Sequence, residues 1–166
     1  MTSDERPRRR TVLSSLGGGI AASLAGCADD AGTSDGDPVY ERRAVDVDGE
    51  ERSESEMATA DRLAVQEIHE QVTPLDALVV ADHEFSLEED YRGSTVQGTV
   101  ENEREDRIET AEVRVRVYDD EGRQLGPYLD HTVDLDGGSE WSFEVVLLEA
   151  PDDIAEYDIT VLGTPT

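Results

Sequence analysis

Lysine is absent from this 166-residue chain, cysteine occurs once, and aromatic residues make up only 5% of the total. With a single cysteine, Cys27, no internal disulfide can form. Arginine is the only basic residue, with 14 copies against 41 acidic residues. Binding of nucleic acid needs clustered basic side chains, so this class of partner is excluded. Because aromatic residues are scarce, a buried core must consist mainly of aliphatic side chains.

The first 26 residues have the pattern of an export signal. Four arginines lie within the first ten residues, and no charged residue occurs between Thr11 and Gly26. This uncharged stretch is shorter than the roughly 20 apolar residues that a membrane-spanning helix needs, and Gly17–Gly19 interrupts it. It therefore predicts a signal peptide rather than a membrane anchor. Arg9 and Arg10, followed by Thr-Val-Leu, resemble the twin-arginine export motif.

A lipobox-like sequence ends this signal: Leu24, Ala25, Gly26 and Cys27. Small residues ahead of the cysteine let a signal peptidase approach the backbone, and the thiol then accepts the lipid. We expect cleavage before Cys27 and attachment to the outer side of the cell membrane through lipid on this residue. The remaining chain has no polybasic second signal, and one acyl chain binds a bilayer only marginally. A two-chain lipid is therefore the predicted anchor.

The acidic excess extends through the whole mature chain. Removal of residues 1–26 leaves ten arginines and 39 acidic residues, a formal charge of −29. This surface repels itself at physiological ionic strength, where the Debye length is about 8 Å, and much less in molar salt, where it is about 3 Å. An acidic tail for a basic partner is the alternative, but the acids are not gathered at one end. We therefore expect adaptation to high salt. The composition and the signal resemble those of haloarchaeal proteins.

Residues 27–74 have less regular patterns. Residues 27–38 are small, acidic and turn-forming, which predicts a flexible tether. Residues 39–74 are ambiguous: a strand fits 39–47, and a short amphipathic helix fits 57–71. The apolar stripe of this helix comprises Met57, Ala60, Ala64 and Ile68. Ser53 and Glu56 could form a capping box ahead of the helix, and Pro74 ends it.

From residue 75 onward, apolar and polar residues alternate with a period of two, which indicates β-strands. The expected inward residues are, strand by strand, Val79, Ala81, His83, Phe85 and Leu87; Val96, Gly98 and Val100; Val113, Val115 and Val117; Trp141, Phe143, Val145 and Leu147; Tyr157, Ile159 and Val161. A further strand fits near 132–135. Turn residues occur at 103–106, 119–122, 136–138 and 151–153. Six to seven one-sided strands bury their apolar faces by pairing two sheets, which predicts a mainly β, Ig-like antiparallel β-sandwich at 75–164.

Three segments resemble a known family. Val115-Arg116-Val117-Tyr118-Asp119 resembles the motif that names the FxLYD domain, with valine at the phenylalanine and leucine positions. The segments GTVEN at 98–102 and GSEWSF at 138–143 resemble the second strand of that family and its turn into an aromatic strand. The resemblance covers about Leu75 to Leu162. It implies a β-sandwich found on exported archaeal and bacterial proteins, often lipoproteins, whose function is unknown, and it implies no catalytic residues.

Few residues suggest chemistry. His83 lies on the expected inward face, which favours a hydrogen-bonded core histidine over a metal ligand. His131, with Asp130 and Asp134, is a candidate cation site, for which a surface ion pair is the alternative. The acidic turns at 46–49 and 119–122 contain fragments of calcium-loop spacing but lack the distal glutamate of an EF-hand.

No motif of a hydrolase, a phosphate-binding loop or a zinc protease is present. We therefore expect a non-catalytic, lipid-anchored cell-surface protein with an Ig-like interaction domain and no cofactor. It would bind the membrane through Cys27 and could bind a protein partner at the cell surface. An accessory lipoprotein that binds a small ligand or a cation is the alternative function. A surface hydrolase is a third hypothesis, which no motif supports.

Overall fold

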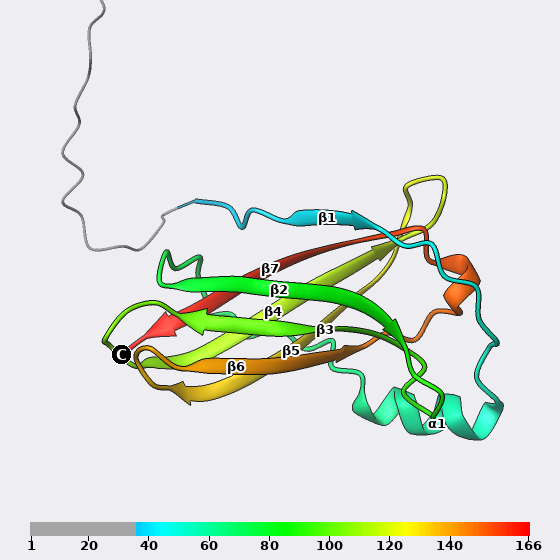
Figure 1. Ribbon diagram of the computed structural model, residues 1–166, viewed down its shortest axis with the longest axis horizontal. Coiled ribbons are helices and arrows are strands. Elements are labelled where there is room, and N and C mark those ends of the chain that lie inside the picture. Colours follow the sequence, from blue (N-terminus) through cyan, green and yellow to red (C-terminus); the bar gives the residue numbers. More distant parts are fainter. Residues whose placement is uncertain (1–35) are drawn as a thin grey trace, which may run out of the picture. The chain divides into compact units, whose positions relative to one another are not determined.

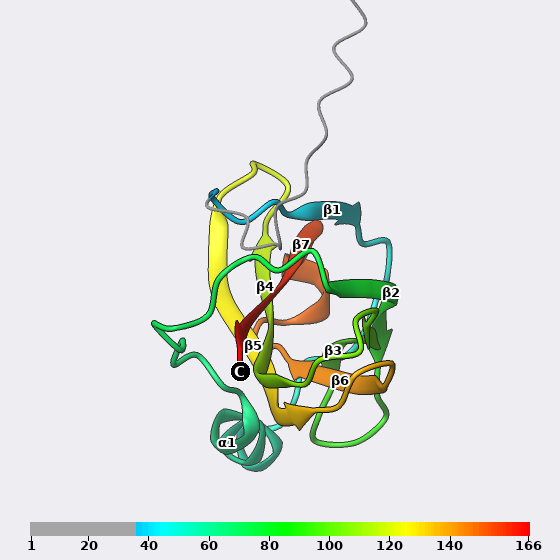
Figure 2. The same cartoon turned by 90° about the vertical axis from the view of Figure 1, so that its left-hand side faces the viewer.

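The computed structural model describes residues 36–166, which form two antiparallel β-sheets packed face to face (Figure 1). The seven strands are β1 (Glu41–Ala44), β2 (Leu78–Leu87), β3 (Ser94–Asn102), β4 (Ile108–Tyr118), β5 (Gln124–Leu135), β6 (Glu140–Val146) and β7 (Glu156–Pro165). One sheet has the order β1-β7-β4-β5 and the other has the order β2-β3-β6. Figure 2 shows the two sheets as separate layers. The predicted Ig-like β-sandwich is confirmed.

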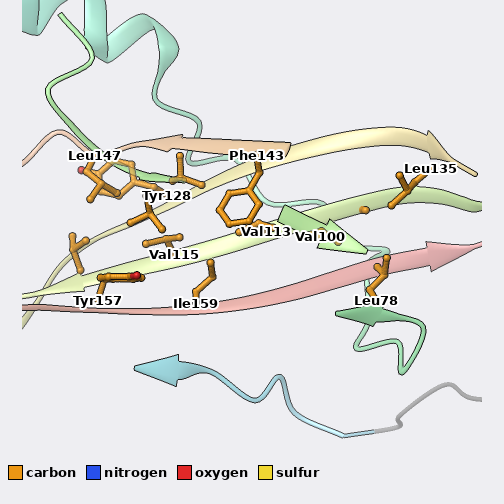
Figure 3. Packing of buried hydrophobic residues seen from close by; sticks show 14 of the residues in the cluster. Leu78, Val100, Val113, Val115, Tyr128, Leu135, Phe143, Leu147, Tyr157 and Ile159 are labelled. Carbon is orange, nitrogen blue, oxygen red and sulfur yellow. The ribbon is translucent and has the colours of Figure 1, made fainter. Parts of the chain in front are cut away.

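The core lies between the two layers and consists mainly of aliphatic side chains, together with Tyr128, Phe143 and Tyr157 (Figure 3). Val113, Val115 and Val117 project from the central strand β4 and are completely buried. Phe143 on β6 is also buried, whereas Trp141 and Phe85, which were expected in the core, are only partly buried at its margin. Burial of each large apolar side chain contributes about 1.5–3 kcal/mol, so one small core of this kind stabilises one domain.

The inward face of β2 changes phase in the middle of the strand. The alternation predicted that Val79 and Ala81 point inward, but both are exposed, and Leu78 is buried instead. A β-bulge between Val80 and Asp82 is the reason, since one extra residue in a strand moves the following side chains to the other face. After the bulge, His83 is buried as predicted.

Strand β1 takes a position that the C-terminal strand normally fills. In an immunoglobulin-type sandwich, strands A, B and E form one sheet, and strand G pairs with strand F in the other. Here β2, β3 and β6 correspond to A, B and E, and β7 corresponds to F. Its neighbour is β1, which comes from the N-terminal side of the domain and pairs with it antiparallel from Glu41↔Ile159 to Ala44↔Glu156. The strand considered for 39–47 therefore forms, but over four residues only.

The helix expected at 57–71 is shorter and begins earlier. Helix α1 spans Glu54–Leu63, and Ser53 and Glu56 form the predicted capping box. The chain leaves the helix at Ala64 because the following backbone pairs with the sheet: the Leu129 N–H donates to the Val65 carbonyl at 2.9 Å. Pairing with a strand requires extended backbone, which overrides the helical propensity of residues 65–71. Ile68, expected on the buried stripe, is consequently 52% exposed.

Candidate functional site

The predicted signal and lipidation residues lie outside the described part of the chain: Arg9, Arg10, Leu24, Ala25, Gly26 and Cys27. The site must therefore be sought in residues 36–166. In this region no helix is long and apolar enough to cross a bilayer.

His83 is a hydrogen-bonded core histidine, as predicted. Its Nδ1 lies 2.7 Å from the hydroxyl of Tyr157, and the two rings meet edge to face. Its Nε2 lies 3.3 Å from Glu41 Oε1 without the geometry of a hydrogen bond. Burial and the positive charge of Arg43 lower the pKa of His83, although Glu41 opposes this shift. The imidazole thus links β2 to β7 through Tyr157.

The three candidate cation ligands on β5 do not form a common site. Asp130 accepts hydrogen bonds from the backbone N–H groups of His131 and Glu144, at 2.8 and 3.0 Å. The ring of His131 contacts that of His69 at a tilt of 59°, with ring centroids 4.7 Å apart, and Asp134 pairs with Arg107 at 2.9 Å. Across residues 36–166, no group of three or more His, Cys, Asp or Glu side chains could hold a metal ion.

The acidic turn at 119–122 has a structural explanation. Asp119 accepts hydrogen bonds from the backbone N–H groups of Glu121 and Arg123 and from Arg123 Nε, at 3.0, 2.8 and 2.7 Å. The backbone N–H of Arg123 contributes most to lowering the pKa of Asp119. Gly122 adopts a φ of +76°, which few other residues tolerate. The acidic residues at this turn resemble a calcium loop in spacing, but the carboxylate of Asp119 serves to close the β4–β5 hairpin.

Glu112, which the alternation placed on the exposed face of β4, is completely buried. The segment after α1 covers it by crossing the outer face of the sheet from β5, where Val65 pairs with Leu129, to β7, where Thr73 pairs with Gly163 (Figure 2). Glu112 Oε2 lies 2.5 Å from His69 Nδ1 and accepts the His69 backbone N–H at 3.0 Å. Its Oε1 accepts a hydrogen bond from Arg114 Nε at 2.5 Å.

The substitution Glu112→Gln is expected to lower the free energy of unfolding by about 1.5–3 kcal/mol, because hydrogen bonds to a charged group are weakened in a buried position. Glu109→Gln is the matched control, since Glu109 is exposed on the same strand. Urea unfolding at constant KCl concentration measures both, because urea leaves the ionic strength unchanged. Equal effects of the two substitutions would contradict the role assigned to Glu112.

A second buried carboxylate, Asp158, organises the outer face beside β1. Arg116 donates to both oxygens of Asp158, at 2.8 and 2.7 Å, and the hydroxyl of Tyr118 donates at 3.0 Å. The hydrogen bonds from Arg116 to Asp158 raise the pKa of Arg116. The guanidinium group of Arg116 lies 3.6 Å from the ring centroid of Tyr40. The guanidinium group of Arg42 lies 4.4 Å from the ring centroid of Tyr118. These contacts fix the chain at β1 against the sheet.

A groove of about 420 Å³ lies between β1 and β2, with β7 as its floor. Its walls are mainly apolar and include Val39, Leu75, Leu78, Val79 and Val161. Val39 is 86% exposed and Val79 is also exposed, so apolar surface is available to a partner at the point where the chain enters the domain.

The edge of β7 is open at this groove. Gly163 exchanges two hydrogen bonds of 2.9 Å with Thr73, so its backbone groups point away from β4. Residues two apart in an antiparallel strand point the same way, so the N–H and C=O of Val161 also face this edge. The pairing with β1 ends at Glu41↔Ile159, so neither β1 nor Thr73 reaches Val161. The groove thus combines apolar walls with a short stretch of strand edge that no backbone group of residues 36–166 is seen to pair with.

Comparison of the chain with protein-family models, with curated proteins and with solved structures finds no match.

Proposed function

We propose that this protein is a non-catalytic, lipid-anchored module of the cell surface, adapted to high salt, that binds an extended segment of a protein partner in the groove between β1 and β2. The open edge of β7 at Val161 carries this proposal, because a free strand edge beside apolar walls is the surface that strand addition uses. The export signal, Cys27 and the acidic composition support the location and the salt adaptation. The resemblance to FxLYD domains, which occur on exported proteins and often on lipoproteins, is consistent with the same location.

The buried carboxylates support an interaction role over a catalytic one. Glu112 and Asp158 are both buried, but each already pairs with an arginine, Arg114 and Arg116 respectively. A general acid or base needs a free proton-transfer position that faces the substrate. Both groups instead lie under segments of the chain that they fasten to the sheet.

A photoreactive residue at position 39 is expected to cross-link a protein partner in native membranes kept in molar KCl, giving a discrete adduct. The same residue at position 133 is the matched control, because Val133 is also highly exposed, at 62%, but lies on β5, outside the groove. Denaturing electrophoresis measures the adduct. Adducts of equal yield at both positions, or none at position 39, would contradict the proposal.

The alternative function, capture of a small ligand, requires a cavity with unpaired polar atoms. One such cavity is present near α1.

A further inference from the structure

A second cavity, of about 190 Å³, lies where four segments meet: the residues ahead of α1, α1 itself, the start of β3, and the loop from β6 to the 3₁₀ turn at Pro151–Asp153. The side chains that matter are those of Arg52, Met57, Ser94, Glu149 and Pro151. This cavity does not include any residue of the groove between β1 and β2.

Two buried polar atoms on side chains that line this cavity have no hydrogen-bond partner among residues 36–166. Ser94 is only 1% exposed, and its Oγ is unpaired. Glu149 Oε1 accepts a hydrogen bond from the hydroxyl of Tyr128 at 2.9 Å, but Glu149 Oε2 is buried and unpaired. Buried polar atoms are nearly always hydrogen-bonded in folded proteins, so two orphans in one small cavity indicate a missing partner.

The positive charge nearest to these atoms is already engaged. Arg52 donates to the backbone carbonyl oxygens of Tyr91 at 3.0 Å and of Leu147 at 2.7 Å, and also to that of Arg92. Burial lowers its pKa. Within residues 36–166, Arg52 forms no ion pair with Glu149. The arginine therefore holds the wall of the cavity together and leaves the carboxylate oxygen unsatisfied.

The net negative charge of the side chains that line the cavity favours a cation as its ligand. Glu50, Glu51 and Glu149 line the cavity against the single positive charge of Arg52. The adjoining depression adds four more acidic side chains, Glu56, Glu88, Glu89 and Asp90. Two of these, Glu88 and Asp90, pair with Arg92, which leaves the lining and the depression negative overall. An anionic or neutral ligand would add to the unbalanced negative charge or leave it uncompensated, whereas a cation reduces it.

The kind of cation follows from the number of ligating groups. Calcium takes six to eight oxygen ligands, and the described residues include no group of three or more His, Cys, Asp or Glu side chains that could hold a metal ion. An ammonium group instead carries N–H donors, each of which needs one acceptor, and Glu149 Oε2 and Ser94 Oγ both accept. The apolar side chains of Met57 and Pro151 would contact the carbon atoms of such a ligand.

We propose that this cavity binds a small primary ammonium compound, whose N–H groups donate to Glu149 Oε2 and Ser94 Oγ. The hydrogen bond to the carboxylate is charge-assisted and supplies most of the affinity, while the hydroxyl orients the group. The site shares no residue with the partner groove, so the two are tested by separate experiments.

Methylammonium chloride, titrated into the soluble Cys27→Ser protein in molar NaCl, is the test. We expect a saturable rise in melting temperature, because the ligand binds the folded state only. Tetramethylammonium has the same charge but no N–H donor, and we expect no saturable rise with it. No saturable effect of methylammonium, or an equal effect of tetramethylammonium, would overturn the proposal.

Variants at the cavity sharpen the test. Glu149→Gln and Ser94→Ala should each weaken methylammonium binding, the first by about tenfold or more, since a charge-assisted hydrogen bond is lost. Glu140→Gln is the matched control: Glu140 is exposed on β6 and does not line the cavity, so this variant should bind as the parent protein does. If Glu149→Gln does not fold, Ser94→Ala alone decides the outcome, because its smaller side chain leaves the carboxylate in place. Unchanged affinity in the folded variants would overturn the proposal.

Discussion

Dilution of the soluble Cys27→Ser domain from molar KCl to about 0.1 M KCl is expected to unfold it cooperatively. The mature chain carries a formal charge of −29, and the Debye length grows from about 3 to about 10 Å on this dilution, so repulsion between the carboxylates is no longer screened. The core that opposes this repulsion is one small cluster of mainly aliphatic side chains, among them Val96, Val113 and Val145.

The single tryptophan provides the measurement. Trp141 packs at the margin of the core, with its ring centroid 6.0 Å from that of Phe143, so its emission should shift to longer wavelength on unfolding. Far-ultraviolet circular dichroism should lose the strand signal at the same KCl concentration, as expected for a two-state transition. A melting temperature indifferent to salt would contradict the predicted adaptation.

A charge variant separates screening from other effects of salt. Glu103, Glu105 and Asp106 are exposed in the loop between β3 and β4. The triple substitution Glu103→Gln, Glu105→Gln, Asp106→Asn should leave the core unchanged and lower the KCl concentration at which half of the molecules are folded. If the midpoint did not move, the salt requirement would come from something other than carboxylate repulsion.

Replacement of Cys27 by serine is expected to release essentially all of the exported protein from the membrane. A hydroxyl cannot take the place of the thiol in the lipid-transfer reaction, and the acidic domain has no basic patch that would hold it at an anionic bilayer. Fractionation of cells into membrane and soluble pools, followed by immunoblotting, measures the shift. The variant Ala28→Ser, one residue further along, is the matched control and should remain in the membrane pool. Tight membrane association of Cys27→Ser would show that another feature anchors the protein.

The strand pattern was predictable because alternation of side chains is a local property. The residues Val113, Val115 and Val117 are buried together since each lies two positions from the next on a regular strand. Turn residues also act locally, as the hydrogen bonds of Asp119 within its own hairpin show. The same reasoning placed His83 in the core, where its partner turned out to be Tyr157.

The sites were less predictable because they depend on contacts between distant segments. Glu112 has the spacing of an exposed residue, and only the segment that carries His69 across the sheet buries it. Ser94 and Glu149 are 55 positions apart in the sequence and have no motif in common, so no pattern could have linked them. The candidate cation site at Asp130, His131 and Asp134 does not form for the same reason. These side chains are close in sequence, but each contacts a different residue of a distant segment.

By itself the sequence determined the class of fold, the turns, and the excess of negative charge, because periodicity, turn propensity and composition are properties of short segments or of the whole chain. The same holds for the predicted export signal and for Cys27, which are adjacent residues in a fixed order. Tertiary structure alone decided that β1 lies beside β7, that α1 ends at Leu63, and that residues 36–166 leave the β7 edge at Val161 unpaired. Each of these features depends on which backbone groups from remote parts of the chain pair with one another, and pairing energies between remote segments leave no local pattern in the sequence.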